Sequence, residues 1–268
     1  MAKVVGVGQF FAWEGGCLFI ARHTSFVPVH AHQAIQLTVA SAGEHQILMG
    51  DVDVRERFSL SAVPSRQPHG IDVTASEHGA VIFIEPETRE GRALTERSLR
   101  GGIAEIGTDE AQAIVAGMFA AWLAGRRDET VAQARRLVQA VAGGIEPAET
   151  TDPRILAAIA YIGQRLPAAV TLDEVAAHAC LSPGRFRHLF AEQTGMGLRP
   201  YVLWRRFMLV WELMMEGSTL STAAHAAGFA DSAHLSRTST RTFGFSPSGM
   251  QFLTSKSGTP VGAHRTTA

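Results

Sequence analysis

Arginine side chains occur in two similar segments of the last third of the chain, residues 171–195 and 220–244. A guanidinium group can donate two hydrogen bonds to the edge of a guanine base in the major groove of DNA. Arg187 in the first segment and Arg237 in the second are therefore candidates for contacts with bases or phosphates. Phosphate contacts fix position on DNA without reading sequence. Three further arginines are candidates for them: Arg185, Arg205 and Arg241.

The first segment has the pattern of a helix-turn-helix. Thr171 can cap one helix, the small Ala179 allows a sharp bend, and Ser182-Pro183 can cap and begin a second helix. Three apolar residues of this second helix share one side: Phe186, Leu189 and Phe190. The residues left on the outward side, where they could enter a groove of DNA, are Gly184, Arg185, Arg187 and His188.

The same pattern returns 49 residues later. Asp231 or Ser232 can begin the second reading helix, which follows a short alanine-rich helix and turn, and Leu235 is expected to be buried. The expected outward residues are Ser232, Ala233, Ser236 and Arg237. Two such units at a fixed separation can place two helices in successive major grooves, so the sequence predicts a DNA-binding region.

The residues between the two copies, 200–216, have a helical pattern with a continuous apolar side that contains Met and Trp. A helix of this length spans about 25 Å. It can therefore act as a rigid spacer that holds two reading helices near the repeat of B-DNA, roughly 34 Å. We expect the Met and Trp side chains to pack in a core.

The two parts of the chain differ in charge. Residues 1–152 carry 13 Lys and Arg against 19 Asp and Glu, whereas residues 153–268 carry 11 against 6. A basic region beside an acidic one indicates nucleic-acid binding by the basic part. The two cysteines, Cys17 and Cys180, lie in different predicted domains, which argues against a disulfide framework. With no secretory signal and no apolar run of about 18 residues, we expect a cytoplasmic protein without membrane contact.

Short apolar runs broken by turn residues occupy residues 4–85 and predict strands of a barrel or sandwich, among them 17–21, 35–40 and 80–84. Helices are predicted over 108–125 and 128–142, and their apolar faces either close the barrel or form a dimer interface. From Pro153 we expect helices to about Phe252. The expected divisions are a β domain over 1–100, a helical dimerisation segment over 101–145, a linker over 146–152, a DNA-binding domain over 153–255 and a flexible tail over 256–268.

Specific strings occur in both copies and in the spacer: Ser182-Pro183 with Phe186 and Leu189-Phe190, Arg206 through Leu213-Met214, Ala227-Gly228-Phe229, His234-Leu235-Ser236-Arg237 and Phe243-Gly244-Phe245-Ser246-Pro247. With them the region from Asp152 to Gln251 resembles the AraC/XylS family of transcriptional regulators. The resemblance implies that two recognition helices read adjacent segments of promoter DNA. It also implies activation or repression of transcription, with RNA polymerase as the partner of an activator.

Three positions depart from the pattern of this family. His188 replaces a common Arg, Ser239 replaces a buried Phe, and Gln251 replaces a frequent Arg. A serine in place of a buried phenylalanine predicts a packing defect that costs on the order of a few kcal/mol. We therefore expect the second reading helix to be the weaker one.

The front part carries a second set of motifs. His30-Ala31-His32, Gln36 and Gly43 follow the spacing of one cupin motif, and Pro64 with His69 follows another. The front part thus resembles the cupin-like effector domain of AraC-type regulators. The expected fold class is α+β, with an N-terminal cupin-like β-barrel plus helices and a C-terminal all-α double helix-turn-helix domain. The resemblance places four residues where metal-binding cupins hold a divalent ion: His30, His32, Gln36 and His69.

The proposed ligand set departs from that of metal-binding cupins. Gln36 replaces an anionic Glu, Arg66 replaces Gly, and Val73 replaces Asn. A neutral amide binds a hard cation poorly, whereas three imidazoles can still hold Zn, Ni or Cu. A small organic effector that is hydrogen-bonded by the same side chains is the alternative.

Alternation along a strand places His30, His32 and Gln36 on one side and Val and Ile residues on the other. If the apolar side packs inward, the histidines lie only on the solvent-exposed face of an amphipathic strand. Alternation does not decide which side is inside.

The sequence as a whole predicts a homodimeric, effector-responsive regulator of transcription that is not an enzyme. Effector binding is expected to shift the population between dimer arrangements. Three alternatives stay open: a metal-sensing regulator that uses His30, His32 and His69, a cupin metalloenzyme with an accessory DNA-binding domain, and a regulator that answers to a protein partner. Gln36 disfavours the enzyme, because the ligand set is then incomplete.

Overall fold

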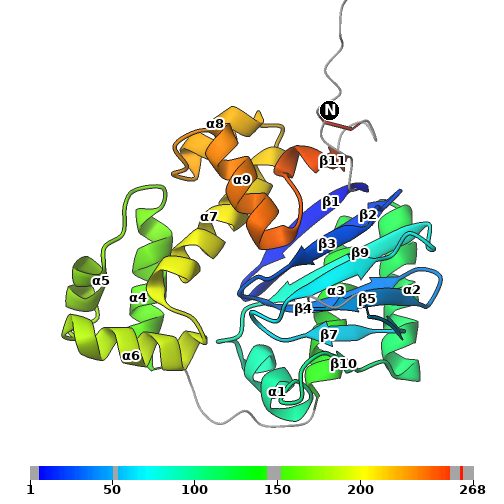
Figure 1. Cartoon of the computed structure of the whole chain (residues 1–268), viewed down its shortest axis with the longest axis horizontal. Helices are drawn as coiled ribbons and strands as arrows, with labels where there is room; N and C mark the ends of the chain where they lie inside the picture. Colours follow the sequence, from blue (N-terminus) through cyan, green and yellow to red (C-terminus); the bar gives the residue numbers. More distant parts are fainter. Residues whose placement is uncertain (1–5, 51–53, 144–151, 254–259, 262–268) are drawn as a thin grey trace, which may run out of the picture.

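The structure is a computed structural model that describes residues 6–50, 54–143, 152–253 and 260–261. A sheet-rich body lies beside a lobe made of helices (Figure 1). The predicted α+β class is confirmed. The strands are β1 Gly6–Trp13, β2 Gly16–Arg22, β3 Val27–His30, β4 Ile35–Ala40, β5 His45–Met49, β6 Arg55–Phe58, β7 Ser61–Val63, β8 His69–Asp72, β9 His78–Ile84, β10 Ala104–Glu105, β11 Met250–Leu253 and β12 Pro260–Val261.

Two sheets form the front part of the chain. The larger sheet has the strand order β10-β7-β4-β9-β2-β1-β11-β12, and the smaller has the order β3-β8-β5-β6. The three predicted strands at 17–21, 35–40 and 80–84 are β2, β4 and β9, which are neighbours in the larger sheet. Their apolar runs are continuous because both faces of these strands are covered.

The two faces of β4 meet different layers. Ile35, Leu37 and Val39 pack in a core that also contains residues of α2 and α3. Gln36 lies on the opposite face and lines a cavity that Val27 of the smaller sheet also lines. The structure therefore shows which way each side of this strand faces, which alternation could not decide. The polar side faces the space between the sheets, and the apolar side faces the helices.

Three helices complete the front part: α1 Arg89–Arg97, α2 Asp109–Leu123 and α3 Arg127–Ala142. The Oγ1 of Thr108 accepts a hydrogen bond from Ala111 N at 3.1 Å and begins α2, as the sequence predicts. The apolar face of α2, with Met118, is buried against the larger sheet. This face was one candidate for a dimer interface, and within this chain it covers the sheet instead. Helix α1, capped by Thr88, was not predicted.

The helical lobe contains α4 Pro153–Arg165, α5 Leu172–His178, α6 Pro183–Thr194, α7 Leu198–Met215, α8 Leu220–Ala226, α9 Ser232–Phe243 and the short 3₁₀ helix η1 Pro247–Gly249. Side-chain caps set the starts of α4, α5, α6, α8 and α9. Asp152 caps α4, and Thr171 forms a reciprocal capping box with Glu174 at the start of α5. The capping signals in the sequence therefore located the helices correctly.

The chain after Gly249 differs from the expected helix to about Phe252. It forms β11, which pairs in parallel with β1 through Gly6↔Met250 and Gly8↔Phe252. The open edge of β1 offers unpaired backbone groups that outweigh a local helical preference. Pro260–Val261, within the expected tail, pair with β11. The rest of the tail after residue 253 and the linker residues before Asp152 lie outside the described residues.

Within the described ranges, none of the helices is both long and apolar enough to cross a membrane. Cys17 is buried in β2, whereas Cys180 is exposed in the turn between α5 and α6. Both thiols are free, in agreement with the expected absence of a disulfide framework.

Candidate functional site

The first reading helix, α6, presents its polar residues to solvent. Ser182 Oγ accepts a hydrogen bond from Arg185 N at 3.4 Å, and Pro183 occupies the first turn. The aromatic residues Phe186 and Phe190 are fully buried in a core shared with α4, α5 and α7. The residues predicted to face outward are all exposed: Gly184, Arg185, Arg187 and His188.

The second reading helix, α9, has the same construction. Asp231 Oδ1 accepts a hydrogen bond from His234 N at 2.6 Å, and Leu235 and Phe243 are buried. The predicted contact residues are exposed or half-buried on the opposite side: Ser232, Ala233, Ser236, Arg237 and Arg241. Both helices can thus offer an arginine to a DNA groove.

Ser239 occupies the position where a buried phenylalanine was expected. Its side chain is fully buried, and its Oγ donates a hydrogen bond to Phe245 O at 2.8 Å. The hydrogen bond satisfies the buried hydroxyl, so the substitution leaves no unpaired polar group. Weaker DNA binding by the second reading helix than by the first remains a prediction.

Helix α7 connects the two reading units as one rigid element. Tyr201 packs in the core around α6, whereas Phe207 and Trp211 pack in the core around α8 and α9. Its Met and Trp side chains therefore belong to cores, as expected. The helix begins at Leu198, two residues before its predicted start, and its 18 residues span about 27 Å.

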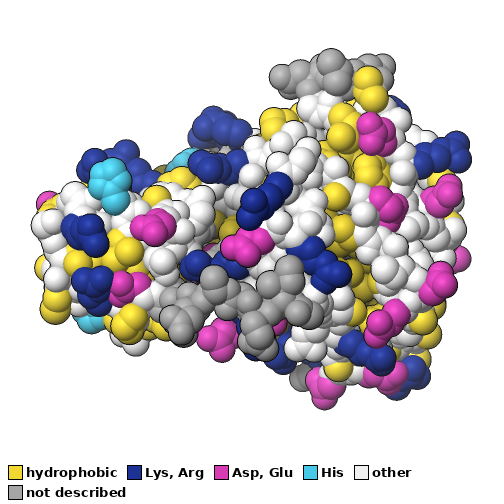
Figure 2. Space-filling view, turned by 90° about the horizontal axis from the view of Figure 1, so that it is seen from below, with side chains coloured by type: hydrophobic (Ala, Val, Ile, Leu, Met, Phe, Trp, Pro, Cys, Tyr) yellow, Lys and Arg dark blue, Asp and Glu magenta, His cyan; other side chains and the backbone are white. Residues whose placement is uncertain are grey.

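Charge is distributed unevenly over one face of the molecule. Lys and Arg side chains gather over the helical lobe in Figure 2, whereas Asp and Glu are more evident over the sheet-rich body. This agrees with the charge difference between the two parts of the sequence. A basic surface on the helical lobe favours contact with DNA phosphates.

Arg205 lies beside an acidic residue of the front part. Its Nη1 lies 4.0 Å from the carboxylate Oε1 of Glu85 in the front part, and its side chain is 34% exposed. Trp204 Nε1 donates to the same carboxylate at 3.3 Å. The sequence could not reveal that this side of α7 faces the front part of the chain. Contact between Arg205 and a DNA phosphate stays a prediction.

Three histidines meet between the sheets. His30 ends β3, His32 follows in the connection to β4, and His69 begins β8. All three are buried, and their ring nitrogens lie within 4.8 Å of one another. The structure therefore brings together the three residues that the cupin resemblance had selected from distant places in the sequence.

Backbone carbonyls orient each of the three rings. The Nδ1 atoms of His30, His32 and His69 lie 2.8, 3.0 and 2.9 Å from the carbonyl oxygens of Pro28, Ala34 and Gln67. A carbonyl accepts only, so each Nδ1 carries the proton and each Nε2 has a free electron pair. This arrangement is the one that usually holds a histidine for metal binding through Nε2.

Burial keeps the three imidazoles neutral at physiological pH. It lowers the pKa of His30 to about 4 and that of His32 to about 3, and it holds the pKa of His69 well below its usual value. Only a neutral imidazole can bind a metal ion. The cluster is therefore in the ligand form without any pH change.

Gln36 contacts this cluster through its side-chain amide. Its Oε1 lies 3.0 Å from His32 Nε2, and its Nε2 lies 3.0 Å from Thr38 Oγ1. Because His32 Nε2 bears no proton, the pair is a hydrogen bond only if the amide is turned so that its NH₂ group donates to His32. The Gln36 amide then donates to the electron pair of His32 Nε2, so a metal ion has to displace this amide from His32.

The residues fit a soft or borderline divalent ion better than a hard one. His69 Nε2 is buried and has no hydrogen-bond partner among the described residues, as expected for an atom that awaits a ligand. Three imidazoles suit Zn, Ni or Cu, whereas the neutral Gln36 adds no negative charge. The nitrogens must move somewhat closer, since Zn–N distances are about 2.1 Å.

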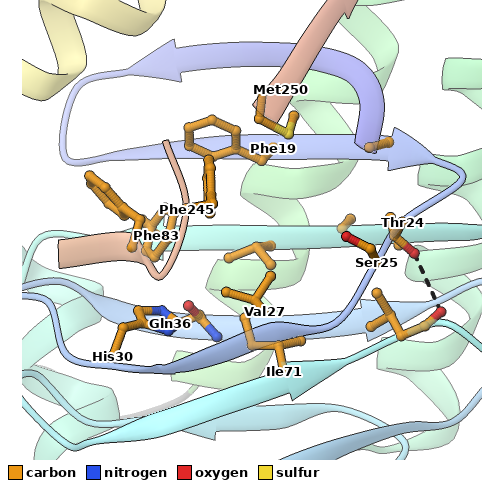
Figure 3. A pocket seen from close by; sticks show the side chains of 16 residues that line it. Phe19, Thr24, Ser25, Val27, His30, Gln36, Ile71, Phe83, Phe245 and Met250 are labelled. Carbon is orange, nitrogen blue, oxygen red and sulfur yellow. Dashed lines mark hydrogen bonds between the residues drawn. The ribbon is translucent and has the colours of Figure 1, made fainter. Parts of the chain in front are cut away.

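A small apolar cavity of about 80 Å³ adjoins the cluster. Phe19, Phe83 and Val27 line it from the front part, and His30 and Gln36 supply polar atoms (Figure 3). The C-terminal part of the chain supplies a further part of the wall: Phe243, Phe245 and Met250. Sequence reasoning missed these three residues, because no local signal shows that one domain closes the cavity of another.

A second contact between the two parts contains Glu87. This carboxyl group is 7% exposed, next to Tyr201 of α7. Burial, and after it the charge of Glu85, raises the pKa of Glu87 to about 8. The pKa of Glu87 is higher in the folded chain than in the unfolded chain, so protonation of Glu87 stabilises the fold. This stabilisation is complete at pH below about 4.5.

We expect this stabilisation to be lost as pH rises toward 8, by an amount on the order of a few kcal/mol. Glu87→Gln keeps the neutral group and should raise the melting temperature above that of the wild type at pH 8 to 9 but not at pH 5. Melting curves across this pH range measure the effect, with the exposed Glu96→Gln on α1 as control. Parallel pH profiles for wild type and Glu87→Gln would contradict it.

Comparisons with known proteins agree with the site. Residues 175–251 match a family described as a helix-turn-helix domain. The probable transcriptional regulator LumQ of Photobacterium leiognathi is 33% identical over 94 residues, which cover 35% of this chain and 38% of LumQ. The arabinose operon regulatory protein of Escherichia coli K12 is 30% identical over 118 residues, which cover 42% of this chain and 39% of that protein. The matches thus span less than two fifths of these relatives.

Solved structures share the fold of nearly the whole chain. ToxT from Vibrio cholerae O395 has a TM-score of 0.56 and 12% identity, covering 88% of this chain and 96% of ToxT. The unsaturated fatty acid bound ToxT of strain SCE256 has a TM-score of 0.55 and 11% identity, covering 90% and 94%. At such identity the likeness concerns the fold alone.

Two capped helices on one connecting helix form a double helix-turn-helix, the arrangement found in one class of DNA-binding domains. Within that class, residues 175–251 match the helix-turn-helix domain family, and the chain as a whole shares the fold of ToxT. The predicted resemblance is confirmed.

Proposed function

We propose that this protein regulates transcription by sequence-specific binding to promoter DNA through α6 and α9. The observation that carries this proposal is the pair of exposed arginines, Arg187 and Arg237, on equivalent capped helices that share the continuous helix α7. The relatives named as regulators support it. A homodimer, contact with RNA polymerase during activation, a cytoplasmic location and the lack of enzymatic activity stay predictions.

The test is selection of DNA from a pool of random duplexes by the full-length protein. We expect enrichment of one sequence with two short conserved elements, spaced by about one helical turn, because two linked helices read successive grooves. Binding to the selected duplex should weaken as salt rises, since Lys and Arg release counterions from phosphates. Recovery of an unenriched pool would contradict the proposal.

The effector is proposed to be a small, mostly apolar molecule with one polar group. The apolar wall of the cavity suits its body, and His30 and Gln36 offer the hydrogen bonds. A solved structure of ToxT holds an unsaturated fatty acid, which supports an apolar ligand class. Because both domains line the cavity, an occupant touches both and alters how they dock.

Metal sensing is a second candidate, favoured by the three carbonyl-oriented histidines. A bound Zn, Ni or Cu ion would supply a positively charged centre that ties together the imidazoles of His30, His32 and His69. These residues come from β3, the following connection and β8, so the ion would join separate segments of the front domain. The metalloenzyme alternative gains no support from Gln36, which brings no charge to the set.

A further inference from the structure

The C-terminal end of the second reading helix lies against the histidine cluster. Gly244 ends α9 in the left-handed region, at φ +76°. A Cβ atom added to Gly244 would lie 2.9 Å from Pro28 O and 3.1 Å from His30 Nδ1. These two atoms form the 2.8 Å hydrogen bond that orients the His30 ring. Any larger residue at position 244 therefore presses on that bond.

The neighbouring Phe243 encloses a second histidine. Its ring lies 6.3 Å from the ring of His32, with an interplanar angle of 27°. Phe83 of β9 meets His32 edge-on at 4.8 Å and meets Phe243 at 5.9 Å. His32 is consequently only 2% exposed, and part of its cover belongs to the DNA-binding domain.

The chain holds this end of α9 on the front domain from two sides. The end of α9 packs on β3, and the chain then runs through η1 into β11, which pairs with β1. The opposite end of the helix, with Ala233 and Arg237, stays exposed. The docked end can thus set the orientation of the reading end.

We propose that metal binding at His30, His32 and His69 and docking of the end of α9 on β3 strengthen one another, with Gly244 as the positioning residue. This inference rests on the metal-sensing candidate of the proposed function. The nitrogens, now within 4.8 Å of one another, must approach to roughly 3.4 Å around a tetrahedral ion. Docking keeps the His30 ring oriented and excludes water, so less ordering remains for the ion to impose.

The coupling is reciprocal by thermodynamic necessity. If docking of α9 raises metal affinity by some factor, the metal favours the docked state by the same factor. Metal binding would therefore hold the second reading helix in one orientation relative to the front domain. In this way an ion that touches no DNA would select which arrangement of α6 and α9 meets a promoter.

The test compares Gly244→Ala with Gly195→Ala in the full-length protein. Gly195 ends α6 in the same left-handed conformation, at φ +67°, but its nearest neighbour in the front domain is Pro86 Cβ at 3.5 Å. Both changes place a side chain at a left-handed helix end, whereas only Gly244→Ala also presses on Val27, Pro28 and His30 of β3. Competition with a chromophoric chelator measures Zn²⁺ affinity. We expect a loss of about tenfold or more for Gly244→Ala and less than twofold for Gly195→Ala.

Hydrogen exchange of the wild-type protein gives a readout that needs no variant. Zn²⁺ should slow exchange of backbone amides in 239–245 and 250–253. Equal Zn²⁺ affinity of the two glycine variants, or unchanged exchange, would overturn the coupling and leave metal sensing intact. If the wild-type protein binds no Zn²⁺, both the coupling and metal sensing are overturned. Selection of a DNA sequence tests the regulatory function separately.

Discussion

Arg187→Ala should weaken binding of the full-length protein to its selected duplex by about 10- to 100-fold. A bidentate arginine–guanine contact is worth about 1 to 3 kcal/mol, and Arg187 stands exposed on the outer side of a capped helix. Arg237→Ala should act similarly at the other element of the site. Because the two arginines lie on different helices, the double variant should lose nearly the sum of the two free energies.

Fluorescence anisotropy with the selected duplex, and with duplexes mutated in each element, measures these losses. Each variant should lose discrimination at one element and keep it at the other. Arg136→Ala, on an exposed position of α3, controls for the loss of one positive charge. Arg205→Ala should leave discrimination unchanged, since Arg205 faces Glu85. Equal weakening on every sequence would show instead that Arg187 only contacts phosphates.

His69→Ala should lower Zn²⁺ affinity by at least about 100-fold. The Nε2 of His69 has no hydrogen-bond partner among the described residues, and the two imidazoles that remain in the variant hold the ion far less tightly. His45→Ala is the matched control, because His45 is equally buried but bonds to Ser61 at 2.7 Å outside the cluster. Titration calorimetry or chelator competition measures the affinities. Similar losses in both variants would rule out a site at the cluster.

Gln36→Glu sharpens the same prediction. A carboxylate at this fully buried position carries a large desolvation cost unless a cation compensates it. The variant should therefore melt below the wild type without metal and gain more than the wild type when Zn²⁺ is added. If Zn²⁺ raises both melting temperatures equally, Gln36 does not adjoin the metal.

Much of the helical lobe follows from local signals. Thr171, Ser182 and Asp231 cap the helices that the sequence predicted, because a capping side chain bonds to backbone groups only two or three residues away. The exposed positions of Arg187 and Arg237 follow from helical periodicity once the caps are known. The resemblance to cupin motifs, rather than a local signal, pointed to one cluster of His30, His32 and His69.

Tertiary structure decided which elements contact one another and which of their faces meet. Alternation along β4 could not tell that Gln36 faces the other sheet, because both faces of that strand are buried and the choice depends on which layer covers each face. Likewise, Arg205 pairs with Glu85, and Phe243 reaches the cavity of the front domain, through contacts between residues more than a hundred positions apart. Local chemistry thus determined the reading helices and the candidate ligands, whereas long-range packing determined how one domain closes on the other.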